Sequence, residues 1–301
     1  MAPHIRSNDT VQRIMLDVII ALLPAVIGSI YYFGAKAAII YVLSILSCVA
    51  SEYIFQKATG REIQIRDLSA VVTGILFAMN LPATAPWYLI IVGGVFAIII
   101  VKQLFGGIGG NFVNPALAAR AMCMAAWPSL MTAYVNPDGA SVATPLGIMK
   151  EGSSLGALPS VERMITGDIA GVIGETSAVL LLIGFIYLLV RRVIDWKVPV
   201  IYIATAAVFF LILGVDTSLL PYQIFGGGLM LGAIFMATDY SSTPMTSKGK
   251  IIFAIGCGLL TAVIRLKGSM AEGVSYSILL MNVASPLIDK FTVEKAYGEG
   301  K

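Results

Sequence analysis

The sequence predicts an all-α polytopic membrane protein with about ten transmembrane segments in two inverted five-span halves with broken helices. Three observations predict this fold class. The 301 residues are 58% hydrophobic and only 12% charged, with a mean hydropathy of +0.89, whereas a soluble domain carries about 25% charged residues. The apolar residues form runs that approach the length needed to cross a bilayer. A pattern of glycines and prolines in the first half recurs in the second.

Ten candidate segments follow one another along the chain. They begin near Ile14, Ala37, Leu68, Trp87, Phe112, Ile169, Val198, Gln223, Ile251 and Gly273. The third ends at Pro82, and the fifth contains Asn114, Pro115 and Arg120. Such broken helices are tolerated only where the freed backbone groups are buried in protein or line a cavity. We expect Asn114 to cap a half-helix whose first residue is Pro115.

The repeat divides the chain into two parts. In each half a glycine-containing helix leads to a proline, Pro82 or Pro244, and is followed by a full span and a small-residue turn. Because five spans per half is an odd number, the two copies would lie inverted in the membrane, an arrangement that places sites near its midplane. We therefore predict one integral membrane domain, 1–301, with half-repeats 1–127 and 169–301 and an extracytoplasmic connection, 128–168.

The distribution of Lys and Arg predicts the orientation, because cytoplasmic loops carry an excess of both. With the N-terminus inside, the outer side receives six of the 20 Lys and Arg residues: Lys36, Arg120, Lys150, Arg163, Arg265 and Lys267. We therefore expect both termini in the cytoplasm and the long connection outside.

Several kinds of site are excluded by composition. The only histidine, His4, lies in the polar N-terminal tail, and the cysteines Cys48, Cys123 and Cys257 are far apart in sequence. The chain alone therefore cannot hold a bis-histidine haem, an iron–sulfur cluster or most zinc sites, and we assign it no metal ligand and no catalytic residue. The apolar composition also excludes nucleic acid as a partner and leaves membrane lipid as the surroundings. Redox chemistry here would need an organic cofactor or a cluster shared with another subunit.

The outer connection contains the run Asp-Gly-Ala-Ser-Val-Ala-Thr, residues 138–144, followed by Pro145. Its Pro-Asp-Gly start is by itself typical of an ordinary turn. Pro145 disfavours a helical conformation for Thr144 and holds it extended. We expect small neighbours to leave the Thr144 hydroxyl on a slim, accessible backbone, which is the shape that a modifying enzyme needs.

This run resembles the signature at which an FAD:protein FMN transferase attaches FMN, through a phosphodiester, to the last threonine. The N-terminal Pro-His-Ile-Arg-Ser, the glycine run 106–110 and the Asn-Phe-Val-Asn-Pro-Ala of 111–116 are similar to the same proteins. The family is the D subunit of the Rnf electron-transport complex, which is related to the B subunit of the sodium-translocating NADH:quinone reductase. The resemblance covers essentially the whole chain. Val142 departs from the family pattern, where this residue is usually smaller.

The resemblance implies a flavoprotein and phosphoprotein with covalent FMN on Thr144. The motif residues carried over for flavin attachment are Asp138, Gly139, Ser141 and Ala143. Of the cations expected near that face in the first half, Arg120, Lys150 and Arg163, one would pair with the linkage phosphate, although each is equally explained as an interfacial residue whose charge reaches water. It further implies a subunit, not catalytic alone, of a translocase that moves electrons between ferredoxin and NAD and couples this to Na+ or H+ transport. The partners would be the other membrane and soluble Rnf subunits and the FMN transferase, at a bacterial or archaeal cytoplasmic (inner) membrane. A second, non-covalent flavin (riboflavin) is a further option.

Acidic residues within apolar spans are candidates for an ion path. Asp17, Glu52 and Glu175 are such residues, and Asp17 and Glu175 are expected in the early turns of the first span of each half. For Asp17 and Glu175 the alternative is an acid near a helix N-terminus, stabilised by the helix dipole.

Two other classes of function remain open. Inverted halves with broken helices also suit a urea- or ammonium-type solute channel or transporter without a redox role. The chain could instead be a passive scaffold within its complex. The flavin signature distinguishes the redox subunit from both.

Overall fold

The computed structural model describes residues 10–140, 142–151, 158–175 and 177–293. Regular structure in these residues is helical, and Pro82 and Val172 form an isolated antiparallel β-bridge. The predicted all-α class is therefore confirmed.

Three helices are long and apolar enough to cross a membrane by length and composition. They are α1 (Val11–Phe33), α2 (Ala35–Ala58) and α13 (Ser247–Lys267). The shorter apolar helices are α3 (Ser69–Met79), α4 (Trp87–Val95) continued by the π-helix η2 (Phe96–Gln103), α5 (Pro115–Ala126), α9 (Ala178–Val190) and α10 (Lys197–Ile212). These helices support a multi-pass membrane protein, while the number of ten spans and the division into repeats stay predictions.

The other elements are shorter, except for α14 (Val274–Thr292). They are η1 (Ile65–Asp67), α6 (Pro128–Met131), α7 (Pro145–Lys150), α8 (Val161–Thr166), η4 (Ile173–Glu175), α11 (Leu220–Phe225), α12 (Leu229–Leu231) and the π-helix η5 (Gly232–Met236).

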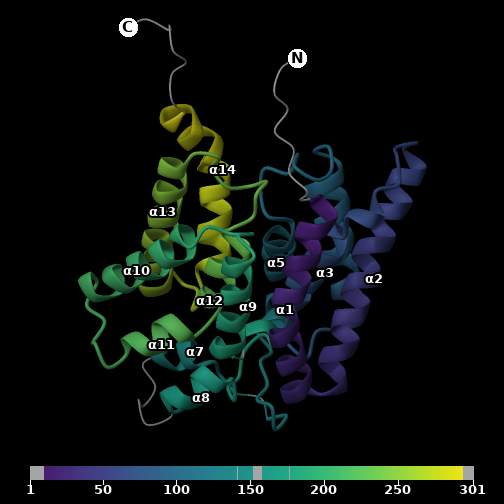
Figure 1. Cartoon of the computed structure of the whole chain (residues 1–301). Coiled ribbons are helices and arrows are strands. Elements are labelled where there is room, and N and C mark those ends of the chain that lie inside the picture. The colour runs from purple at the N-terminus through teal and green to yellow at the C-terminus, as the bar shows by residue number, and fades with distance from the viewer. Residues whose placement is uncertain (1–9, 141, 152–157, 176, 294–301) are drawn as a thin grey trace, which may run out of the picture.

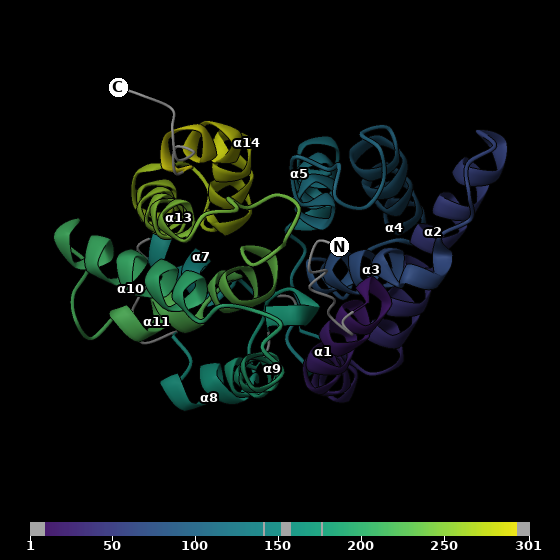
Figure 2. The same ribbon diagram turned by 45° about the horizontal axis from the view of Figure 1, so that its top comes forward.

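The two parts of the chain form two adjoining groups of helices (Figure 2). In the first group α2 packs against α3 and α4, and in the second α10 and α14 pack against α13. The first helices of the two halves, α1 and α9, pack against each other. The start of α1 and the end of α14 lie at one end of the molecule, and α7, α8 and α11 lie at the other (Figure 1).

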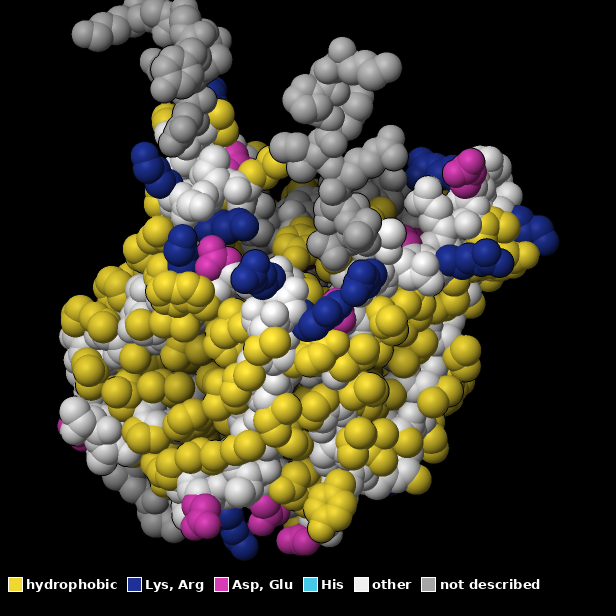
Figure 3. Space-filling view, in the orientation of Figure 1, with side chains coloured by type: hydrophobic (Ala, Val, Ile, Leu, Met, Phe, Trp, Pro, Cys, Tyr) yellow, Lys and Arg dark blue, Asp and Glu magenta, His cyan; other side chains and the backbone are white. Residues whose placement is uncertain are grey.

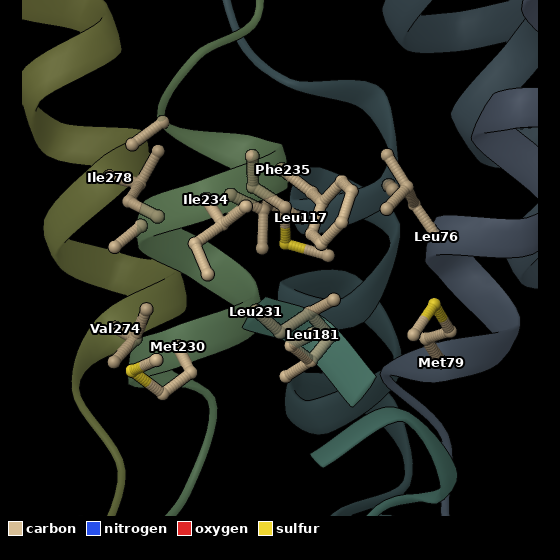
Figure 4. Close-up of a cluster of buried hydrophobic side chains, with 14 of the residues drawn as sticks. Leu76, Met79, Leu117, Leu181, Met230, Leu231, Ile234, Phe235, Val274 and Ile278 are labelled. Carbon is tan, nitrogen blue, oxygen red and sulfur yellow. The ribbon is translucent and has the colours of Figure 1, made fainter. Parts of the chain in front are cut away.

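The core joins the two groups. Leu76 and Met79 of α3 and Leu117 of α5 lie in one apolar cluster with Leu181 of α9 and side chains of α12, η5 and α14 (Figure 4). Residues from far apart in the chain therefore share one interior.

The surface in Figure 3 has a broad hydrophobic belt between two polar ends. Lys and Arg side chains gather at the end where α1 begins, whereas more of the charged side chains at the opposite end are acidic in this view. A belt of this kind is what lipid contact requires.

Half-length helices occur where the sequence predicts them. Helix α3 has 11 residues and α5 has 12, so each is only about 16–18 Å long at 1.5 Å per residue. The Asn114 side chain accepts hydrogen bonds from the backbone N–H groups of Ala116 and Leu117, at 3.1 and 3.2 Å, and Pro115 is in the first turn. The predicted cap of α5 is confirmed.

The sixth and eighth segments differ from prediction. Helix α9 begins at Ala178, not near Ile169, because the preceding residues lie against α3: a Cβ at Gly174 would be 2.3 Å from the Cβ of Met79. Glu175 consequently lies in η4, before α9, and not in the early turns of a span. The glycine-containing helix expected to lead to Pro244 is interrupted near its start, where Gly227 has a φ of +63°.

Candidate functional site

A cavity of about 490 Å³ lies beside Thr144. Its lining combines residues of α5, α7 and the turn between α13 and α14 with the segment after α6. They include Arg120, Met124, Tyr134, Ala143, Thr144, Gly147, Met270, Glu272 and Tyr276. This volume falls within the range of about 300–1,000 Å³ that is typical of small-molecule sites. We name it the Thr144 cavity.

Thr144 is the N-cap of α7. Its backbone is extended, with φ −66° and ψ 156°, as Pro145 predicts, and its Oγ1 accepts a hydrogen bond from the N–H of Gly147 at 3.1 Å. The expectation that Thr144 is accessible is wrong in this fold, because only 8% of the residue is exposed. The burial comes from the second part of the chain: Ile169 and Gly227, among others, line a small recess with Thr144.

Arg120 lies at the inner wall of the Thr144 cavity and is buried. Its Nη1 donates to Asn80 Oδ1 at 2.7 Å and pairs with Glu175 Oε1 at 3.4 Å, and its Nη2 pairs with Glu272. Glu175 is also buried. Two carboxylates and one guanidinium therefore meet beside the predicted attachment residue.

Arg265, a second buried arginine, adjoins this group. Its Nη2 donates to the carbonyl of Gly226 at 3.2 Å, and its Nη1 donates to the carbonyl of Gln223. Gln223 lies in the last turn of α11 and Gly226 directly follows it, so Arg265 satisfies backbone groups that the end of this broken helix leaves free. A Cβ at Gly227 would lie 3.0 Å from Arg265 Nη2 and 3.5 Å from Glu272 Cγ, which places the two charges close together.

The other two cations proposed for the phosphate have partners of their own. The Nζ of Lys150 donates to the carbonyls of Gly268 at 2.7 Å and Arg265 at 3.3 Å, and also to that of Met270. Desolvation at this contact lowers the pKa of the Lys150 ammonium from its usual value. Arg163 forms an exposed pair with Asp168, Nε to Oδ2 at 3.4 Å.

The remaining motif residues are spread out. Ala143 lines the Thr144 cavity. Asp138 and Gly139 lie in an exposed turn, in which the Gly139 N–H donates to the carbonyl of Asn136 at 2.8 Å and Gly139 has a φ of +82°. Val142 is exposed. Ser141 lies outside the described residues.

A second cavity, of about 540 Å³, lies at the opposite end of the molecule, where α1 begins. Polar groups of the segment after η5 and of α14 line it, among them Asp239, Ser241, Asn282 and Asp289. Asn282 Oδ1 accepts from the N–H of Asn114 at 3.2 Å, so the start of α5 borders this region. Gly106, Gly107 and Gly109 have positive φ angles in the turn before α5.

Glu52 lies in α2, far from the Thr144 cavity in the chain, and is only 1% exposed. Its Oε1 pairs with Lys102 Nζ at 2.7 Å and accepts from Gln103 Nε2 at 2.6 Å, while Oε2 has no hydrogen-bond partner among the residues that the structure describes. Lys102 also donates to Ser69 at 2.6 Å. The predicted orientation places Lys102 among the cytoplasmic Lys and Arg residues, but its side chain is buried in the protein.

Asp17 lies near the start of α1. Its Oδ2 pairs with Arg191 Nη2 at 3.1 Å, and its Oδ1 accepts from Tyr187 at 2.9 Å. The three acids pair with three different basic residues, Asp17 with Arg191, Glu52 with Lys102 and Glu175 with Arg120, and within the described part of the chain no hydrogen bond or ion pair joins these acids to one another.

Among the site residues that the sequence analysis missed are Glu272 and Tyr134, which line the Thr144 cavity, and Asn80, which accepts a hydrogen bond from Arg120. Glu272 follows α13 in an otherwise apolar and small-residue stretch, Met-Ala-Glu-Gly, and an isolated acid at such a position is the signal that could have identified it. Tyr134 and Asn80 carry no comparable signal.

Comparison with known proteins covers nearly the whole chain. The sequence profile of the NQR2, RnfD, RnfE family matches residues 1–298. The chain is 52% identical over 305 residues to the D subunit of the Na(+)-translocating ferredoxin:NAD(+) oxidoreductase complex of Acetobacterium woodii, an alignment that covers 100% of this chain and 95% of the relative. It is 42% identical to the D subunit of the proton-translocating ferredoxin:NAD(+) oxidoreductase complex of Clostridium ljungdahlii, with 99% and 95% covered. It is 37% identical to the D subunit of an ion-translocating oxidoreductase complex of Stutzerimonas stutzeri, with 97% and 93% covered.

Proposed function

Since the chain belongs to the NQR2, RnfD, RnfE family, we propose that it is the D subunit of an ion-translocating ferredoxin:NAD oxidoreductase complex and carries electrons on an FMN joined to Thr144. The protein acts with the other Rnf subunits, because its sequence has no recognisable NAD or ferredoxin site. The observation that carries the proposal is the Thr144 cavity, which joins the motif threonine to a buried cluster of charges.

The residues around Thr144 fit a flavin. The cavity of about 490 Å³ is bordered by Tyr134 and Tyr276, and aromatic and apolar walls are typical of cofactor sites. A Cβ at position 147 would lie 3.3 Å from Thr144 Oγ1, so Gly147 keeps the space beside that oxygen open. When bound, FMN supplies one- and two-electron transfer.

The charges around the cavity suit a phosphodiester. The group contains two positive side chains, Arg120 and Arg265, and two negative ones, Glu175 and Glu272, so its formal net charge is zero. The phosphodiester linkage would add a single negative charge to this group. Arg120 is the buried cation that lines the cavity with Thr144. Its role is to hold Glu175 and Glu272 in place beside the linkage.

A second, non-covalent flavin is proposed for the cavity at the opposite end. Its volume of about 540 Å³ is sufficient for a small ligand. The hydroxyl and carboxylate groups of Ser241 and Asp289 provide polar partners along its wall. Riboflavin, which has no phosphate, suits a site that contains Asp239 and Asp289.

Two further proposals concern the membrane. The gathering of Lys and Arg at the end where α1 begins supports a cytoplasmic location for that end and an outer location for Thr144. Asp17, Glu52 and Glu175 are all buried and remain candidates for an ion path, and Asp17 is the one that pairs with a partly exposed cation, Arg191. The ion itself, Na+ or H+, differs between the named relatives.

Ultraviolet fluorescence of the chain on a denaturing gel tests the covalent flavin. The chain is produced together with an FAD:protein FMN transferase, as wild type and as Thr144→Ala and Thr132→Ala variants. Thr132 lines the same cavity and is therefore the matched control. We expect fluorescent bands for wild type and Thr132→Ala and none for Thr144→Ala. A wild-type band without fluorescence would contradict the proposal and favour a solute channel.

A further inference from the structure

We propose that Lys150 is a positioning residue that fixes the two walls of the Thr144 cavity relative to each other, and so sets the orientation of the group on Thr144. The inference rests on the proposed function. One wall is the start of α7, with Ala143, Thr144 and Gly147, and the other is the 269–272 turn after α13. Lys150, the last residue of α7, bridges from the first wall to the second.

The bridge consists of three contacts from one ammonium group. Lys150 Nζ donates to the carbonyls of Gly268 at 2.7 Å and Arg265 at 3.3 Å, and to that of Met270. The last carbonyls of a helix have no partner within the helix, and a lysine at that end satisfies them and interacts favourably with the helix dipole. Lys150 therefore caps the C-terminal end of α13, although it lies in a different part of the chain.

Helix α7 needs contacts with the rest of the protein, such as those of Lys150, to stay folded. It has only six residues, and isolated helices of this length do not persist in water. Its apolar contacts include Leu146, which lies against the glycine stretch at Gly226 and Gly227. Lys150 is six residues beyond Thr144, about 9 Å along a helix axis, so the polar contact is at the opposite end of α7 from the attachment residue.

The Lys150 contacts also connect to the charged side chains of Arg120, Glu175 and Glu272. The turn that accepts from Lys150 continues directly to Glu272, which pairs with Arg120. The carbonyl of Arg265 accepts from Lys150, while its side chain donates to the carbonyl of Gly226. Movement of α7 away from the turn would therefore change the distance between Thr144 and the Arg120–Glu272 pair.

The number of N–H donors on the Lys150 ammonium distinguishes a positioning role from direct binding of the phosphate. An ammonium has three N–H donors, and Lys150 directs contacts at three carbonyl oxygens. No donor remains for the phosphate unless one of these contacts is given up. Lys150 thus acts through the protein backbone, and Arg120 is left as the cation that lines the cavity.

The test uses the full chain produced with the FMN transferase, as wild type, Lys150→Gln, Lys150→Arg and Lys267→Gln. Lys267, exposed at the end of α13, is the control for loss of one positive charge in this region. The mass of the Thr144 peptide is measured first, and then the visible circular dichroism and fluorescence anisotropy of the attached flavin. We expect full labelling in all four proteins, and loss of the induced dichroism with lower anisotropy only in Lys150→Gln. Lys150→Arg should retain both signals, because a guanidinium also donates to carbonyls.

Each other outcome is decisive. Unchanged signals in a fully labelled Lys150→Gln protein, or the same loss in Lys267→Gln, would overturn the positioning role alone. Absence of label or of folding in Lys150→Gln would also overturn it, since Lys150 would then act in enzyme recognition or in stability. Absence of label in the wild type would instead overturn the proposed function, and the positioning role with it.

Discussion

Arg120 and Glu175 form a buried ion pair between the two parts of the chain. Arg120 Nη1 lies 3.4 Å from Glu175 Oε1, and the two side chains are 5% and 4% exposed. Arg120 belongs to the half-length helix α5 and Glu175 to η4, before α9. Because Glu272 joins the same guanidinium, residues from three distant segments converge beside Thr144.

Replacement of Arg120 by methionine should destabilise the protein strongly. It leaves Glu175 and Glu272 without their cation, and loss of one partner of a buried pair costs about 3–5 kcal/mol. The control is Arg163→Met, which breaks an exposed pair with Asp168 and should cost less than about 1 kcal/mol. Thermal unfolding in detergent or nanodiscs measures both, and equal midpoints for the two variants would contradict the buried cluster.

The Glu52–Lys102 pair should show strong coupling. Lys102→Met leaves the Glu52 carboxylate uncompensated, and we expect a loss of about 3–5 kcal/mol. Glu52→Gln combined with Lys102→Met removes both charges, so the double variant should be more stable than the Lys102→Met single variant. A double-mutant cycle of unfolding free energies measures the coupling. Strictly additive effects would show that the two side chains do not interact.

The cap of α5 should contribute measurably to stability. Asn114→Ala removes the acceptor for the N–H groups of Ala116 and Leu117 and should cost about 1 kcal/mol. Asn114→Ser keeps a capping oxygen and should retain a large part of that amount. Chemical denaturation of the three proteins provides the comparison, and an Asn114→Ala protein as stable as Asn114→Ser would contradict the cap.

Close packing of η4 against α3 predicts a difference between two nearby glycines. A Cβ at Gly174 would lie 2.3 Å from Met79 Cβ and 2.7 Å from its carbonyl oxygen, whereas one at Gly171 would meet nothing nearer than 3.9 Å. Gly174→Ala should therefore cost about 1–3 kcal/mol, and Gly171→Ala much less. Melting temperatures of the two variants, compared with wild type, check this difference, and a Gly174→Ala protein with a wild-type melting temperature would contradict it.

Features set by neighbouring residues could be predicted from the sequence. The cap at Asn114 depends on residues two and three positions ahead, and the extended conformation of Thr144 depends on Pro145. The all-helical class follows from long apolar runs. Local chemistry is sufficient for such predictions because the interacting groups are a few residues apart.

Features that depend on residues far apart in the chain could not be predicted from the sequence. Thr144 is buried beside a small recess that it lines together with Ile169 and Gly227, which lie in the second part of the chain. Lys102 has the charge typical of a loop but finds Glu52 fifty residues away. The run from Ile169 is apolar enough for a helix, yet contact between Gly174 and Met79 favours a compact non-helical path. Tertiary packing decides each of these cases.

Mass spectrometry of the peptide that contains Thr144 tests the central claim most directly. The peptide is taken from chain produced with an FAD:protein FMN transferase, so that a missing enzyme cannot account for a negative result. The account predicts one FMN phosphoryl increment, located on Thr144 by fragmentation. A peptide of unmodified mass, or an increment on another residue, would contradict it.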